Sequence, residues 1–313
     1  MILITGGTGY VGTHTVHELH ERGGRVRCVV RRGASGEKTA YLRKLGLEIV
    51  EADLTDARQL ESALDGVDTI AHLAGSIRPA RGETPRMIHV DTTKSLLRAA
   101  QQRGIRRFVL LSSLGARQNG NTEYHRTKWV AEEAVRDSGI PFVIVRPTLN
   151  FGLLVGTRES KLMSRMTQAI LRGSTIRLVA GGQNIIRPIF VGDVAHCLVE
   201  AILGNTATGI GVDLGGPEQM TFEQLIERLA RHHGCAAKTR RVPFGPVFVL
   251  AKLLERFVES PPFTSTEVRA LREDNTCEID KMKRTFHIEP VSLECGLSLA
   301  AEREPLVAVG RIA

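Results

Sequence analysis

Met1 to Gly12 read MILITGGTGYVG, and this stretch decides the fold. The apolar run Ile2-Leu3-Ile4 is typical of a buried strand, and it passes directly into a glycine-rich turn. A helix is expected immediately afterwards, over residues 13–21. This context predicts a dinucleotide-binding loop, because glycines let the backbone approach a pyrophosphate and a helix N-terminus favours negative charge.

Two glycine registers fit the loop, Gly7-x-Gly9-x-x-Gly12 and Gly6-x-x-Gly9-x-x-Gly12. The alternative to a binding loop is a tight strand-to-helix turn without a ligand, and the position between a strand and a helix favours the binding loop. The cofactor contacts predicted from this segment are Gly6, Thr8, Gly9, Tyr10, Val11 and Gly12.

The composition indicates a mainly aliphatic core, since 42% of the 313 residues are hydrophobic and only 4% are aromatic. The net charge of +8 comes from scattered basic residues, which favours an ordinary solvated surface over one built to attract anions. We expect no nucleic-acid partner. No run reaches the roughly eighteen apolar residues of a transmembrane helix.

The five cysteines lie far apart, are odd in number and form no C-x-x-C pair. This spacing argues against a disulfide framework and against a zinc site, so no metal is expected. The chain begins directly with the first strand, which does not fit a cleavable signal. Together these features predict a cytoplasmic protein in a reducing compartment.

Strands and helices alternate through the first half of the chain. Strands are expected over residues 25–31, 47–52, 67–74, 107–112 and 141–146, and helices over 39–45, 56–64, 85–103 and 123–138. This rhythm predicts an α/β fold, a Rossmann-type doubly wound parallel sheet with right-handed crossovers. A smaller substrate lobe, interleaved with the sheet, is expected from the C-terminal half.

The expected organisation places a dinucleotide-binding domain at residues 1–150, with 185–215 returning to it. The substrate lobe comprises 151–184 and 216–300, and 301–313 form a tail. Within these segments we predict helices at 161–171, 194–203 and 221–233, and strands at 189–191 and 212–214. Asp193 is expected to cap the second of these helices, and Thr221 with Gln224 to form a capping box on the third.

Tyr124 and Lys128 are the strongest candidates for chemistry. On a helix, residues four apart lie on the same face, so the ammonium of Lys128 would lie beside the phenol of Tyr124. A neighbouring positive charge lowers the pKa of a phenol and lets it exchange protons near neutral pH. Ser113 follows the preceding strand and should lie at the same edge of the sheet.

The glycine loop, Ser113 and the Tyr124/Lys128 pair together resemble the short-chain dehydrogenase/reductase superfamily, over roughly residues 1–295. Later motifs look like its extended and atypical branches, the epimerase/dehydratase-like proteins related to the nucleotide-binding accessory subunit of respiratory complex I. These motifs are Asp53-Leu54, Ala74-Gly75, Arg146-Pro147, Asn150-Phe151-Gly152, the segment from Arg187 to Asp193, and Asp274-Asn275-Thr276.

The resemblance implies a role for each matching residue. Tyr124 would be the general acid/base, Lys128 would hold the nicotinamide ribose and lower the tyrosine pKa, and Ser113 would hydrogen-bond the oxygen of a small-molecule substrate. Ser113 can equally be a strand-end serine that bonds the local backbone, and both interpretations stay open. The remaining cofactor contacts implied by the resemblance are Asp53, Leu54, Ala74, Gly75 and Pro147.

The chain departs from the family pattern in two places, of which the first weakens the expectation of a complete proton relay and the second concerns the segment that helps to build the substrate pocket. Many extended members carry Asn-Val-x-Gly-Thr before the fifth strand, where this chain has His89 in place of Asn and Thr92 in place of Gly. The segment between Ser113 and Tyr124 is also shorter than in sugar-nucleotide epimerases and dehydratases.

Arg31 and Arg32 determine the expected cofactor. An NAD site places an acid at the end of the second strand, whereas this chain has two arginines there and no acid before Glu37. Guanidinium groups suit a 2′-phosphate, so NADP(H) is predicted in preference to NAD(H). The alternative is that both arginines simply face water.

The apolar segment from Val242 to Phe257 has two interpretations. It is expected to be an ordinary buried helix of the substrate lobe; the alternatives are the lining of a pocket for a lipid-like substrate or a peripheral contact with a membrane surface.

The sequence supports two functions. The leading hypothesis is an NADP(H)-dependent oxidoreductase acting on a carbonyl or an alcohol, including transient oxidation within an epimerase or dehydratase cycle. The alternative is a non-catalytic NADPH-binding protein with a structural, assembly or sensing role, which the likeness to the complex I subunit implies. The substrate and the oligomeric state are not predicted.

Overall fold

Seven parallel strands form the central sheet of the described part of the chain, in the order β11-β6-β5-β4-β1-β2-β3. The computed structural model describes residues 1–302 except for 35, 78–81, 154, 157–159 and 259–260. The strands of this sheet are β1 (Ile2–Thr5), β2 (Val26–Val30), β3 (Glu48–Glu51), β4 (Thr69–His72), β5 (Arg107–Leu111), β6 (Phe142–Pro147) and β11 (Ile210–Leu214). The predicted doubly wound α/β fold is confirmed.

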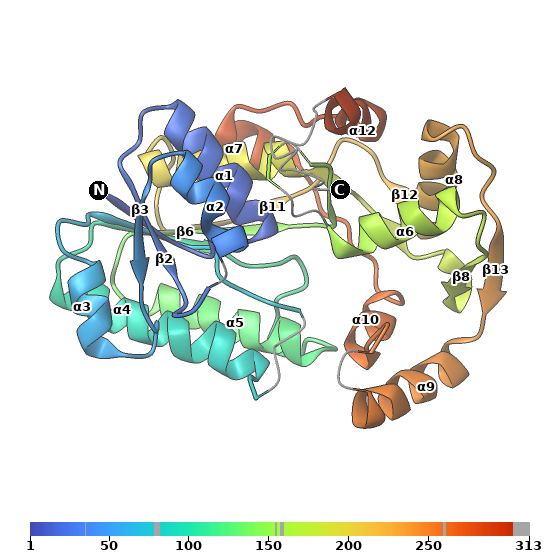
Figure 1. Ribbon diagram of the computed structural model, residues 1–313, viewed down its shortest axis with the longest axis horizontal. Coiled ribbons are helices and arrows are strands. Elements are labelled where there is room, and N and C mark those ends of the chain that lie inside the picture. Colours follow the sequence, from blue (N-terminus) through green and yellow to red (C-terminus); the bar gives the residue numbers. More distant parts are fainter. Residues whose placement is uncertain (35, 78–81, 154, 157–159, 259–260, 303–313) are drawn as a thin grey trace, which may run out of the picture.

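Helices cover both faces of this sheet (Figure 1). On one face α1 (Tyr10–Glu21), α2 (Gly36–Lys44) and α7 (Val191–Leu203) pack into one aliphatic core. On the other face α3 (Ala57–Ala63), α4 (Thr92–Gln102) and α5 (Glu123–Arg136) pack into a second. Since the strands are parallel and their order reverses between β1 and β4, a ligand crevice is expected at the carboxyl ends of the strands.

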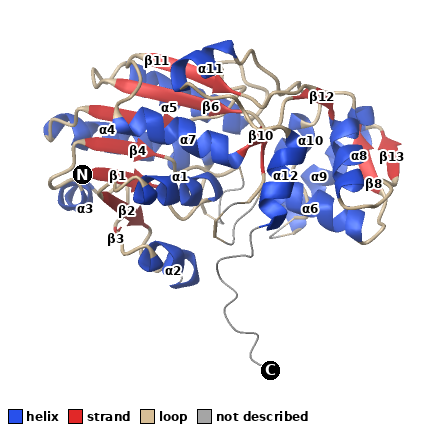
Figure 2. Cartoon of the chain, turned by 90° about the horizontal axis from the view of Figure 1, so that it is seen from above, coloured by secondary structure: helices blue, strands red, loops and turns tan. Residues whose placement is uncertain are grey.

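A second group of elements lies beside this sheet, at the end toward which β10 points in Figure 2. It contains α6 (Lys161–Leu171), α8 (Phe222–His232), α9 (Phe244–Phe257), α10 (Ser265–Ala270) and α12 (Leu293–Glu302). Short strand pairs join it: β7 (Asn150–Phe151) with β10 (Ile189–Phe190), β9 (Ile185–Ile186) with β12 (Met220–Thr221), and β8 (Ile176–Val179) with β13 (Thr239–Val242). Helix α11 (Asp280–Phe286) returns to pack on β11 and α7.

Several expected element boundaries are wrong. Helix α1 begins at Tyr10 rather than at residue 13, because Gly9 in the loop takes the N-cap position. Helix α7 begins at Val191, with Phe190 as its N-cap, so Asp193 lies inside the first turn and does not cap it. The expected single helix over 85–103 is a π-helical turn, η1 (Met87–Asp91), followed by α4. The capping box of Thr221 and Gln224 on α8 is confirmed.

Helix α9 is not the ordinary buried helix that the sequence favoured. Only Ala251 is fully buried in it, whereas four of its large apolar side chains are about half exposed or more. These are Val249, Leu250, Leu253 and Phe257. In the part of the chain that the structure describes, no helix combines the length and the apolar character that crossing a bilayer requires.

All five cysteines carry free thiols, and Cys28 and Cys197 are buried in the sheet core. Among the described residues, no group of three or more His, Cys, Asp or Glu side chains is arranged to hold a metal ion.

Asp193 ties the C-terminal part of the chain to α7. Its buried carboxylate accepts a hydrogen bond from the backbone N–H of Val291 at 2.8 Å, across 98 positions of sequence. Burial raises the pKa of this carboxyl from its ordinary value of 3.8 to about 6. The folded chain therefore holds the proton more tightly than the unfolded chain does, and this stabilisation is lost as the pH rises through about 6.

We predict that Asp193→Asn stabilises the protein at neutral pH. The amide keeps an acceptor for Val291 but cannot ionise, so the free energy of unfolding should exceed that of the wild type by about 1–3 kcal/mol at pH 7. The difference should vanish below about pH 3, where the wild-type carboxyl is protonated in both states. Urea denaturation at the two pH values measures it, and a wild type that is the more stable at pH 7 would contradict the assignment.

Candidate active site

The glycine loop adopts the register of Gly6, Gly9 and Gly12, because two of these positions have no room for a side chain. Gly6 has a φ of +77°, and a Cβ there would lie 2.6 Å from the backbone nitrogen of Ala74. A Cβ on Gly12 would lie 2.1 Å from the carbonyl oxygen of Gly6. The loop is therefore pressed against the end of β4 and against the first turn of α1.

The N-terminus of α1 carries no acidic residue and no side-chain cap. Its N-cap is Gly9, whose N–H donates to the carbonyl of Gly6 at 2.8 Å. Helix N-termini present N–H groups and the positive end of the helix dipole, so this end of α1 is suited to an anion.

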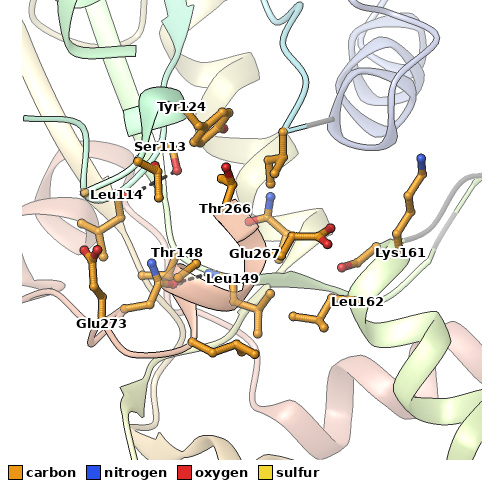
Figure 3. A pocket seen from close by; sticks show the side chains of 18 of the residues that line it. Ser113, Leu114, Tyr124, Thr148, Leu149, Lys161, Leu162, Thr266, Glu267 and Glu273 are labelled. Carbon is orange, nitrogen blue, oxygen red and sulfur yellow. Dashed lines mark hydrogen bonds between the residues drawn. The ribbon is translucent and has the colours of Figure 1, made fainter. Parts of the chain in front are cut away.

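Tyr124 and Ser113 lie together in the cavity beyond the carboxyl ends of β5 and β6 (Figure 3). Tyr124 is in the first turn of α5, which Thr122 caps by accepting a hydrogen bond from the N–H of His125. Ser113 follows β5; its hydroxyl donates to the carbonyl of Leu114 at 3.2 Å and lies near enough to the phenol of Tyr124 to affect its pKa. The local backbone bond, one of the two interpretations of Ser113, is therefore present, and the contact with a substrate oxygen stays a prediction.

The pKa of the Tyr124 phenol is raised in this structure, so the net lowering expected from Lys128 is not seen. Burial raises the pKa of the Tyr124 phenol above its ordinary value of 10, while the Ser113 hydroxyl acts in the opposite direction. In the chain alone, the phenol of Tyr124 is therefore protonated at neutral pH.

Lys128 is buried on the inner side of α5, one turn after Tyr124. Its ammonium donates to the carbonyl of Leu111 at 2.9 Å. Burial lowers the pKa of Lys128 to about 8, and the nearby carboxylate of Glu132 opposes the shift. Gly75 leaves room for the Lys128 ammonium, since a Cβ at position 75 would lie 2.9 Å from the Lys128 nitrogen.

His89 lies in the π-helical turn η1, at the position where the family pattern carries Asn. Its Nε2 accepts from the N–H of Ser76 at 3.2 Å, so its Nδ1 donates to the hydroxyl of Thr127 at 2.9 Å. Burial and the charge of Lys128 lower the pKa of His89 to about 3, which keeps the ring neutral. The ring also packs edge-on against Tyr124, at 5.2 Å between centroids.

A buried ion pair holds α5 against the sheet. The carboxylate of Glu132 is fully buried and accepts two hydrogen bonds from Arg146 of β6, at 2.7 Å and 2.5 Å. Arg146 also pairs with Asp213 of β11, and its pKa is raised by both carboxylates although burial opposes them. This bidentate contact positions the helix that carries Tyr124 and Lys128.

The described residues enclose a cavity of about 2160 Å³ that runs from the glycine loop into the second lobe. This volume exceeds that of an ordinary small-ligand pocket, roughly 300–1,000 Å³, and is sufficient for a dinucleotide together with a substrate. The predicted site residues that line it are Gly6, Gly9, Tyr10, Val11, Gly12, Gly75, Ser113, Tyr124, Lys128 and Pro147.

The remaining predicted cofactor contacts do not line this cavity. Thr8 belongs to the glycine loop, and Ala74 packs behind Gly6. Arg31 and Arg32 follow β2 and are exposed, with Arg31 paired to Glu83. Asp53 and Leu54 follow β3, and the Asp53 carboxylate accepts from the N–H and the hydroxyl of Thr55, which lowers its pKa.

Further residues line the cavity, most of them from the second lobe, and of these only the segment 242–257 was weighed from the sequence, as an alternative pocket lining. His125, next to Tyr124, and Glu273, which pairs with Arg117 at 3.0 Å, both line it. On the α6 side the lining includes Lys161, Leu162 and Arg165 (Figure 3 labels the first two). On the α9 and α10 side most of the lining is apolar and includes Val242, Pro243, Val247, Leu250, Phe263 and Leu271, while Thr266 and Glu267 of α10 add a hydroxyl and a carboxylate. Only the apolar character of 242–257 could have been noticed from the sequence.

The late family motifs meet at the inner wall of this cavity. The side-chain oxygen of Asn275 accepts from the N–H of Leu149 at 2.8 Å, and its carbonyl accepts from the N–H of Arg187 at 3.0 Å. Three segments that are far apart in the sequence are thereby joined by one asparagine.

Sequence comparison finds relatives of several kinds. The chain is 34% identical to ceramide reductase of Caulobacter vibrioides over 152 residues, which is 49% of this chain and about half (47%) of that protein. It is 26% identical to the photosystem II assembly factor Ycf39 of Cyanophora paradoxa, over 93% of this chain and 88% of that protein. It is 24% identical to the 40 kDa subunit of NADH-ubiquinone oxidoreductase of Neurospora crassa, over 93% of this chain and 76% of that protein.

Solved structures of low identity share the fold. UDP-glucose 4-epimerase from Thermotoga maritima superposes with a TM-score of 0.74 at 21% identity, over 96% of this chain and 97% of that one. UDP-glucuronic acid 4-epimerase from Bacillus cereus, solved in complex with NAD, superposes with a TM-score of 0.74 at 20% identity, over 96% of each chain. The family model described as the NAD dependent epimerase/dehydratase family matches residues 2–211, and the chain therefore belongs to that family.

Proposed function

We propose that the protein is an NADP(H)-dependent oxidoreductase that interconverts a carbonyl and an alcohol. The observation that carries this proposal is the shared cavity, in which Tyr124 and Ser113 face the same space as the glycine loop. When bound, the nicotinamide ring would supply or accept hydride.

The residues of the loop fit a dinucleotide. Gly6 and Gly12 leave a backbone cradle that any Cβ would fill, and the uncapped N-terminus of α1 adjoins it. These are the features that let a pyrophosphate approach the backbone closely. Arg31 and Arg32 would select the 2′-phosphate of NADP(H) from the loop after β2.

The raised pKa of Tyr124 favours a role as a general acid. A protonated phenol can donate to the oxygen of a carbonyl as it gains negative charge, whereas a phenolate cannot. Ser113 would hold the same oxygen. In the proposed reduction of a carbonyl, the phenol would donate its proton and Lys128 would limit the charge that builds up on the phenol.

The substrate is proposed to have an apolar body. The wall on the α9 and α10 side is mainly aliphatic and aromatic, with Thr266 and Glu267 as its polar groups. Two of the relatives, each 34% identical over about half of the chain, are named ceramide reductase and sterol demethylase protein B, and both names refer to lipids. A hydrophobic ketone fits this wall better than a sugar nucleotide does.

A non-catalytic NADPH-binding role is the second candidate. The relatives that match over nine-tenths of the chain include an assembly factor and a subunit of a respiratory complex. His89 at the position of the family Asn also favours this candidate, because the neutral ring is engaged by Ser76 and Thr127. The two candidates differ in what they require of the Tyr124 hydroxyl.

We predict that Tyr124→Phe abolishes turnover and leaves cofactor affinity unchanged. The ring and its contact with His89 remain, while the proton donor is removed, and loss of a general acid lowers the rate by about 10²–10⁴-fold. Reduction of a panel of long-chain ketones, followed by NADPH absorbance, gives kcat, and fluorescence titration gives the Kd for NADPH. Equal turnover by the two proteins would remove Tyr124 from the chemistry.

We predict that replacing Arg31 and Arg32 with alanine weakens NADPH binding at least tenfold and changes NADH binding little, because only NADPH carries the 2′-phosphate. Arg25→Ala is the matched control, since this exposed arginine precedes β2 and lies at the opposite end of that strand from Arg31 and Arg32. Isothermal titration with both cofactors measures the ratio. Unchanged NADPH affinity in the double variant would defeat the assignment of NADP(H).

A further inference from the structure

Helix α9 has two apolar faces, and the second lobe covers only one of them. The inner face, Phe244, Val247, Phe248 and Ala251, packs against Val179, Val268 and their neighbours. The outer face carries Val249, Leu250, Leu253 and Phe257, which are 58%, 49%, 51% and 77% exposed. These residues recur at intervals of three and four, so they form one stripe along the helix, here called the outer stripe.

The outer stripe is a concentrated feature rather than scattered surface apolarity. Eleven large hydrophobic residues are exposed in the described part of the chain, and five of them lie on α9 or directly after it. Figure 1 places α9 at the border of the molecule, beside α10 and far from the seven-stranded sheet. A contiguous exposed apolar patch of this kind marks an interaction surface.

The charges around the outer stripe favour an anionic partner. Lys252 and Arg256 are exposed on α9 along one side of the stripe. Arg269 and Arg272 lie over the inner-face rings of Phe248 and Phe244, at 4.9 Å and 4.6 Å, and add exposed positive charge next to α9.

The acid on the helix is already engaged. Glu255 accepts hydrogen bonds from the N–H and the hydroxyl of Ser265. Lys252 and Arg256 are thus the outward charges of α9, and the chain as a whole carries +8.

We propose that the outer stripe of α9 docks the protein on the surface of an anionic lipid bilayer. A helix with leucine, valine and phenylalanine on one face and lysine and arginine beside it lies in the interface between headgroups and acyl chains. A second copy of this chain is the less suitable occupant, because a two-fold contact through α9 would bring the cations of both copies together.

Docking in this orientation has a consequence for the cavity. Leu250 belongs to the outer stripe and also lines the cavity. Leu162 of α6, which is exposed, lines the cavity as well. The cavity therefore opens beside the stripe, and a membrane-bound chain would receive an apolar substrate directly from the bilayer. This consequence rests on the proposed function, whereas the docking does not.

The test is co-sedimentation of the full chain with two kinds of vesicle, phosphatidylcholine alone and a 70:30 mixture of phosphatidylcholine and phosphatidylglycerol. We expect binding to the anionic vesicles, weaker binding to the neutral ones, and a loss of the difference at high salt. The double variant Leu253→Glu with Phe257→Glu should bind the anionic vesicles at least tenfold more weakly. Lys252→Glu with Arg256→Glu should lose the preference for anionic lipid.

The matched control is Met87→Glu with Leu203→Glu, which adds the same two charges at exposed apolar positions outside α9. It should bind vesicles as the wild type does, and all variants should keep their melting temperature and NADPH affinity. Tyr124→Phe should also bind vesicles normally, which separates docking from catalysis. Wild-type protein that ignores anionic vesicles would overturn the proposal. So would a dimer that only the α9 variants dissociate, since that result assigns the stripe to self-association.

Discussion

The backbone of Gly12 lies against the carbonyl oxygen of Gly6, and the rest of the site depends on this contact. A Cβ at position 12 would lie 2.1 Å from that oxygen, and one at position 6 would lie 2.6 Å from the nitrogen of Ala74. Because neither position tolerates a side chain, α1 can begin at Tyr10 directly beyond β1 and direct its N-terminus into the cavity. The same constraint places the loop opposite α5, so the anion-binding end of one helix and the phenol of another share a single space.

The position of α5 depends on buried charge. Glu132 and Arg146 form a bidentate pair at 0% and 17% side-chain exposure, and such a pair is stabilising only when its hydrogen bonds are complete. Here Arg146 also reaches Asp213, and Glu132 also reaches Arg136, so each partner is further satisfied. Removing one partner would leave an uncompensated charge beneath the helix that carries Tyr124. The pair therefore determines where the phenol lies without touching the cavity itself.

The features that sequence reasoning predicted well are those with local causes. The glycine loop, the alternating strands and helices, and the capping box on α8 all follow from neighbouring residues. The failures have long-range causes. Asp193 resembles a helix cap, yet its carboxylate is engaged by Val291, 98 positions away. The outer stripe of α9 has the composition of a core segment, and only the tertiary structure reveals which face lacks a neighbour. The pKa of Tyr124 likewise depends on burial, which the spacing of Tyr and Lys does not reveal.

Beside Tyr124, the positive charge is that of Lys128, because the two nearby buried histidines are neutral. His72 and His89 both have a pKa lowered to about 3, so they are neutral at physiological pH. Lys128, with a pKa of about 8, is mostly charged at pH 7 but loses its proton only slightly above that value. An anionic ligand on the glycine loop would favour the charged ammonium, because an opposite charge in the same cavity raises the pKa of a lysine. A charged Lys128 in turn favours ionisation of the neighbouring phenol. Binding of a phosphorylated cofactor would therefore move the pKa of Tyr124 downward from its raised value, and proton transfer would become easiest when the cavity is loaded.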